Sequence, residues 1–234
     1  LYESVVAHEY QHLIHDDYNP DDDTFMNEGC SMYAEVLCGY PIDWNAINSY
    51  LYTPDNSLVD WGDQGDINIL ADYGAALLWT VYLSDHYGGA DFIRYFVQSG
   101  VPGIEGINLA LAHFGHSETF DDVFRDWRIA NLIHSDVPGR GRYNYVTIDL
   151  GGTEAVEPRV YEVKATYPEL VPPTKGTDFG TTVTILGYDT GVSTLGAYGS
   201  DYVRIDGLKA SWVPKLVFDG DDEAGPRWVR EDMD

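Results

Sequence analysis

Apolar residues recur every three to four positions through most of the first 134 residues, and glycine, proline and aspartate interrupt them at intervals. Apolar side chains at this spacing lie along one face of a helix. The interrupting residue types favour helix ends and turns. The pattern therefore predicts a series of helices, with residues 40–69 mostly in loop apart from one short helix. The predicted helices cover residues 1–16, 24–39, 43–51, 70–87, 90–99, 104–114 and 118–134.

The pattern changes after the glycine- and proline-rich residues 138–141, where apolar and polar residues begin to alternate. Alternation with a period of two is typical of strands, and turn residues separate the segments that show it. We therefore expect an antiparallel, β-rich, sandwich-like module over residues 143–234. Its predicted strands are residues 143–148, 159–164, 181–186, 201–205 and 215–218. The expected fold class is thus α+β, with a mainly helical part over residues 1–138 and a domain boundary near 138–145.

Acidic residues dominate the charge of this 234-residue chain: 39 acidic and 13 basic residues give a formal charge of −26. Such a charge argues against a protein that binds nucleic acid or an anionic membrane. No apolar run reaches about 18 residues, so no membrane span is expected. An acidic surface suits a secreted protein in saline or calcium-containing surroundings. Halophilic adaptation within the cytoplasm would produce the same composition.

A candidate metal site lies near the start of the chain, in the segment His8-Glu9-Tyr10-Gln11-His12. Residues four apart share a helix face, so His8 and His12 can point two imidazoles at one ion. Glu9 can then reach a water bound to that ion, as in the H-E-x-x-H pattern of zinc peptidases. Apolar neighbours such as Val5 and Leu13 lead us to expect a largely buried helix. The alternative is a pair of core histidines with ordinary hydrogen bonds.

The next predicted helix supplies a third ligand. A catalytic zinc usually has three protein ligands and a fourth position for water. Glu28 can complete a set of two histidines and one glutamate. Glu35 lies seven residues further on, which is two helical turns, so both carboxylates share a face. Glu35 could accept a hydrogen bond from the far nitrogen of a liganding histidine and so fix its tautomer. The alternative for both glutamates is a solvated helix face.

The stretch HEYQHLIH followed by FMNEGCSMYAE resembles the gluzincin superfamily of metallopeptidases. It looks most like secreted bacterial and archaeal members of the hyicolysin type and the immune inhibitor A type. The resemblance is strong over residues 1 to about 40 and fainter over about 66 to 135. It implies that His8, His12 and Glu28 bind zinc and that Glu9 is the general base. It also implies that Glu35 supports a zinc-binding histidine.

Gluzincin catalytic domains carry a twisted sheet before this helix, and no such sheet precedes His8 here. The resemblance therefore implies a fragment that lacks the N-terminal part of its catalytic domain, and it leaves endo- and exopeptidase activity equally open. Gluzincins of the aminopeptidase type also place a tyrosine at the start of a helix, where its hydroxyl stabilises the oxyanion. By this resemblance Tyr73 is the candidate for that role, and a tyrosine that only packs at a helix start is the alternative.

The expected function is zinc-dependent hydrolysis of peptide bonds in protein or peptide substrates. One alternative is a non-catalytic zinc-binding module whose β-rich part binds a surface or a partner. The intact Glu9 argues against that alternative, because a structural zinc needs no base and favours a closed ligand set. A second alternative is a metal-free helical core.

Acidic clusters at residues 16–17, 21–23 and 219–223 could bind Ca²⁺, which favours several oxygen ligands. Solvated loops are the alternative for each of them.

The two cysteines, Cys30 and Cys38, lie eight residues apart on one predicted helix, or about 12 Å along its axis. This separation is too large for a disulfide, so both are expected to be free thiols.

Overall fold

The fold is known from a computed structural model, which describes residues 2–164 and 197–206. All the predicted helices are confirmed, with ends that differ from the prediction by at most two residues. The helices are α1 (Tyr2–Tyr18), α2 (Thr24–Leu37), α3 (Trp44–Tyr52), α4 (Ile69–Tyr87), α5 (Gly89–Ser99), α6 (Gly103–His113) and α7 (Phe120–Ile133). Two short 3-10 turns, η1 (Asp66–Asn68) and η2 (Pro138–Gly141), and two strands, β1 (Val160–Lys164) and β2 (Tyr202–Asp206), complete the described elements.

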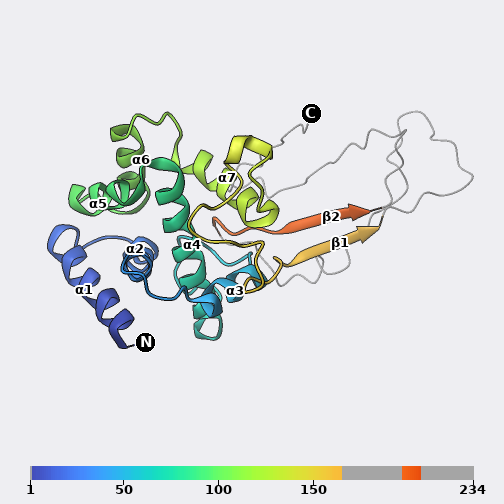
Figure 1. The fold of residues 1–234 in the computed structure, drawn as a ribbon, viewed down its shortest axis with the longest axis horizontal. Helices are drawn as coiled ribbons and strands as arrows, with labels where there is room; N and C mark the ends of the chain where they lie inside the picture. Colours follow the sequence, from blue (N-terminus) through green and yellow to red (C-terminus); the bar gives the residue numbers. More distant parts are fainter. Residues whose placement is uncertain (1, 165–196, 207–234) are drawn as a thin grey trace, which may run out of the picture.

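Helix α4 forms the centre of the core, and α2, α3 and α5 pack around it (Figure 1). Nearly every residue of α4 from Ala71 to Ser84 is buried, which is expected of a helix that is apolar on all sides. Trp79 lies in the middle of α4, and its ring centroid is 4.9 Å from that of Phe120 and 5.4 Å from that of Trp127. Helix α7 is thereby joined to the same core.

Two glycines allow helices to approach α4 closely. A Cβ atom at Gly29 of α2 would lie 2.7 Å from the carbonyl oxygen of Ala76 and 2.3 Å from the hydroxyl of Thr80. A Cβ atom at Gly74 of α4 would lie 2.1 Å from the carbonyl oxygen of Ala46 in α3. Gly29 therefore sets the distance between α2 and α4, and it directly follows Glu28.

Replacement of Gly29 by alanine is expected to destabilise the metal-free protein by about 1–3 kcal/mol, because the new methyl group overpacks a contact that includes backbone atoms. Urea denaturation would measure the change in the free energy of unfolding. An unchanged unfolding midpoint for Gly29→Ala would show that α2 can move without cost.

Helix α1 is far less buried than its apolar residues led us to expect. Only Ser4 and His15 are buried on it, whereas Val5 is 51% and Leu13 is 69% exposed. The polar side chains of α1 face α2 and bond to it, so the apolar side chains point outward. The expectation of a largely buried helix was wrong because polar contacts, and not apolar packing, determine which face of α1 meets the protein.

The expectation of an antiparallel, β-rich, sandwich-like module is also wrong for the described residues. Apart from one short pair of strands, this part of the chain is helical or irregular. Strands β1 and β2 match two of the predicted segments, but they pair in parallel, with Val160 opposite Tyr202 (Figure 1). The alternating pattern predicts a strand but does not specify its partner. The predicted strands at 181–186 and 215–218 lie outside the described residues.

Residues 143–148 do not form the predicted strand. The carboxylate of Asp85 accepts hydrogen bonds from the backbone N–H groups of Val146 and Thr147, which a strand would have donated to a neighbour. Tyr145 is 4% exposed and its hydroxyl donates to Asn131 of α7. The alternation in this segment reflects side chains that insert into the helical core.

Candidate metal centre

His8 and His12 lie one turn apart on α1, and their Nε2 atoms face each other at 3.1 Å. Glu28 approaches both from α2: its Oε2 atom is 3.3 Å from Nε2 of His8 and 3.5 Å from Nε2 of His12. The packing of α1 against α2 thus brings His8 and His12 together with Glu28, which lies sixteen positions after His12 in the sequence.

The far nitrogens of both histidines are engaged. Nδ1 of His8 donates to Glu35 Oε1 at 2.9 Å, and Nδ1 of His12 donates to Asn27 Oδ1 at 2.5 Å. These oxygens can only accept, so each Nδ1 carries a proton and, in a neutral imidazole, Nε2 carries none. The unprotonated Nε2 atoms of His8 and His12 and the carboxylate oxygen of Glu28 then lie close together, and none of the three carries a hydrogen that could bond to the others.

The buried oxygen of Glu28 that faces the histidines has no hydrogen-bond partner. A buried carboxylate oxygen without a partner is costly unless a cation compensates it. His8, His12 and Glu28 could therefore hold a metal ion, and they form the one such group of three found among the described residues. The arrangement fits a cation better than it fits a pair of ordinary core histidines.

Protons compete with a metal for these atoms. The carboxylate of Glu28, 3.3 Å from Nε2, favours a proton on His8 and raises its pKa above the usual value; partial burial opposes this, and the hydrogen bond to Glu35 adds to it. In the metal-free protein a proton on Nε2 of His8 can thus take the place of the cation. Metal binding must displace that proton, so acidification is expected to weaken it.

Glu35 does contact one of the two histidines of the candidate site: it accepts a hydrogen bond from His8. Asn27, which was not predicted from the sequence, accepts the corresponding hydrogen bond from His12. Asn27 could have been predicted from its position directly before Glu28. Successive residues of a helix are turned by about 100°, so the side chain before Glu28 can reach the second histidine from the side. A pair of such contacts fixes both rings, because outer hydrogen bonds set the tautomer and orientation of metal-binding imidazoles.

Glu9 and Tyr73 complete the surroundings of the three residues. Glu9 is exposed on α1, directly after His8. Tyr73 lies on the first turns of α4; partial burial raises the pKa of its phenol, and the negative charges of Glu28 and then Glu9 raise it further. These charges can act on Tyr73 because it lies near both glutamates. The ring of Trp61 packs edge-on against Tyr73 at a centroid distance of 4.9 Å.

The acidic clusters considered for calcium do not form a comparable group in the part of the chain that the structure describes. In the cluster at residues 21–23, Asp22 accepts hydrogen bonds from His15 and from the backbone N–H groups of Asp23 and Gly103. Its oxygens are therefore already occupied by donors. The cluster at 219–223 lies outside the described residues.

Two further predictions from the sequence concern the cysteines and a membrane span. Cys30 is buried, Cys38 is exposed, and both are free thiols. Among the described residues, none of the helices combines the length and the apolar character that a membrane crossing requires.

No protein-family model matches this sequence, and no curated protein matches it either.

Proposed function

We propose that this chain carries the metal centre of a zinc-dependent peptidase of the gluzincin type, which acts on protein or peptide substrates outside the cell. One observation carries the proposal: two imidazole nitrogens and one carboxylate oxygen converge, with Glu9 adjacent. Zinc bonds of about 2.0–2.1 Å at tetrahedral angles would place neighbouring ligand atoms about 3.3–3.4 Å apart. The separations here are 3.1, 3.3 and 3.5 Å.

The number and type of ligands favour catalysis over a structural role. Structural zinc sites are usually closed by four protein ligands, whereas catalytic sites use three and leave a fourth position for water. The group that could hold an ion among the described residues consists of two histidines and a glutamate. This donor set is the one found in zinc peptidases of the thermolysin kind.

Bound zinc would supply a Lewis acid that lowers the pKa of a water molecule and polarises the scissile carbonyl. Glu9 would accept a proton from the attacking water and return it to the leaving amine. The exposed position of Glu9 leaves it accessible to both. Tyr73 would donate a hydrogen bond to the carbonyl oxygen as negative charge develops on it. Glu35 and Asn27 would hold the two imidazoles in place.

Metal removal tests this proposal. The full chain should bind one zinc ion and cleave casein; dialysis against a chelator should abolish cleavage, and added zinc should restore it. Mass spectrometry of the products would identify the new amino termini. Zinc binding without any cleavage would favour the non-catalytic zinc module instead, and the absence of zinc binding would contradict the proposal altogether.

Replacement of Tyr73 by phenylalanine should lower kcat by about 10²- to 10³-fold with little change in KM, because the lost hydroxyl acts on charge that develops in the transition state. Steady-state kinetics on a fluorogenic peptide would measure both constants. Tyr52→Phe is the matched control, since Tyr52 is 68% exposed at the end of α3. If kcat stays within the range of that control, Tyr73 has only a packing role.

A further inference from the structure

A chain of hydrogen bonds leads away from the metal centre on the far side of His12. Besides Asn27, Nδ1 of His12 contacts the hydroxyl of Ser31 at 3.0 Å. Ser31 donates its own hydrogen to Oε1 of Gln11 at 2.5 Å. Ser31 is fully buried on α2, and Gln11 is the residue directly before His12 on α1. Both contacts of Ser31 therefore join α2 to α1, the two helices that carry the proposed metal-binding residues.

The chain continues from Gln11 into the interior. The amide of Gln11 donates to Nδ1 of His15 at 3.2 Å, and Nε2 of His15 donates to Oδ2 of Asp22 at 2.7 Å. The side chains of His15 and Asp22 are both 0% exposed. The other oxygen of Asp22 accepts from the backbone N–H groups of Gly103 at 2.7 Å and of Asp23 at 2.9 Å. The chain thus ends on a carboxylate that the start of α6 holds in place.

The protons of this chain can be arranged in only one order when a metal binds His12. Metal at Nε2 leaves the proton of His12 on Nδ1, where Asn27 and Ser31 share it as acceptors, so the hydroxyl of Ser31 must donate to Gln11. The amide nitrogen of Gln11 then donates to Nδ1 of His15, so the proton of His15 lies on Nε2, toward Asp22. Every donor points away from the metal, and a buried negative charge terminates the series.

We propose that Ser31, Gln11, His15 and Asp22 form a relay that positions His12 for metal binding, with Gln11 and Ser31 as its positioning residues. The inference rests on the proposed metal centre. Burial of an imidazole and a carboxylate is costly unless they are bonded to each other and to neighbours, and here each link is made. Loss of an outer hydrogen bond to a metal-binding histidine typically weakens metal affinity by about 10- to 100-fold.

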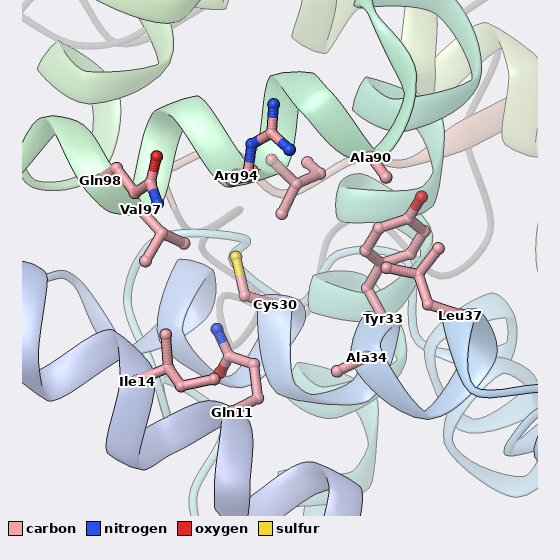
Figure 2. A pocket seen from close by; sticks show the side chains of 11 residues that line it. Gln11, Ile14, Cys30, Tyr33, Ala34, Leu37, Ala90, Arg94, Val97 and Gln98 are labelled. Carbon is pink, nitrogen blue, oxygen red and sulfur yellow. The ribbon is translucent and has the colours of Figure 1, made fainter.

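Gln11 also borders a cavity of about 170 Å³ between α1, α2 and α5 (Figure 2). Ile14, Cys30 and Val97 line the same cavity, which is mainly apolar. A methionine in place of Gln11 has similar length and no hydrogen-bonding amide, and the cavity gives it space. The relay can therefore be interrupted at Gln11 without crowding the helices.

The test compares zinc dissociation constants, measured by competition with a chromophoric chelator, for the wild type and variants of the full chain. Gln11→Met and Ser31→Ala should bind zinc about 10- to 100-fold more weakly. Ile14→Ala, on the same helix and cavity but outside the relay, is the matched control and should not change the affinity.

A second measurement separates positioning from general stability. The visible absorption spectrum of the Co²⁺-substituted protein reports on the geometry of the ligands, and it should change in Gln11→Met but not in Ile14→Ala. Unchanged affinity and spectrum in Gln11→Met would overturn the relay, even if Ser31→Ala fails to fold. A wild type that binds no zinc would overturn both the relay and the proposed function. Loss of peptidase activity with normal zinc affinity would count against the function alone.

Discussion

Replacement of Glu9 by glutamine should lower the rate of peptide hydrolysis by about 10²- to 10⁴-fold, the usual contribution of a general base, while zinc remains bound. Glutamine keeps the shape of the side chain but cannot accept the proton of the attacking water. Glu9 is not among the three residues that could hold the ion, so the metal content should match that of the wild type. Casein cleavage and zinc content, measured on the same preparation, would test both statements.

Glu3→Gln is the matched control for this experiment, because Glu3 is also an exposed glutamate on α1 but lies more than one turn before the histidines. Both variants remove one negative charge from the same helix. A similar loss of activity in the two would indicate an effect of charge alone. Wild-type activity in Glu9→Gln would remove Glu9 from the mechanism.

Replacement of Glu28 by alanine should abolish zinc binding at micromolar metal concentrations. The variant removes the carboxylate that, among the described residues, lies within 3.5 Å of both histidine Nε2 atoms. Two neighbouring histidines on one helix would remain, and they cannot supply the three protein ligands of a catalytic zinc. Equilibrium dialysis followed by elemental analysis would measure the zinc content.

Glu105→Ala is the control for Glu28→Ala, since Glu105 is an exposed glutamate in the first turn of α6. It should retain zinc and activity. Unchanged zinc occupancy in Glu28→Ala would show that Glu35 or another residue supplies the third ligand. Because Glu28 also has a buried oxygen without a partner, its removal is not expected to lower the stability of the metal-free protein greatly.

The helices could be predicted from sequence because their signals are local. Helix α7, for example, begins after Thr119, which forms a capping box with Asp122, and its apolar residues recur at helical spacing. The burial of α1 and the pairing of the strands could not be predicted in the same way. They depend on which distant segment lies opposite, as the contacts of Asp85 with Val146 and Thr147 illustrate.

Part of the candidate site could also be predicted from local spacing, and part of it could not. His8, His12, Glu28 and Glu35 are set by spacing within two helices, so one assumption, that α1 packs against α2, brings them together. The relay has no such signature. Gln11 and Ser31 are twenty residues apart, and polar residues of these types are common on any helix. Only the packed structure shows that their donors and acceptors match in order.

The central claim is that His8, His12 and Glu28 hold one zinc ion with a position open to water. X-ray absorption at the zinc edge of the protein loaded with one equivalent of metal tests it directly. We expect only nitrogen and oxygen neighbours at about 2.0–2.2 Å, with outer scattering from two imidazole rings. A sulfur neighbour at about 2.3 Å, as Cys30 or Cys38 would supply, or the signature of a single imidazole would contradict the account.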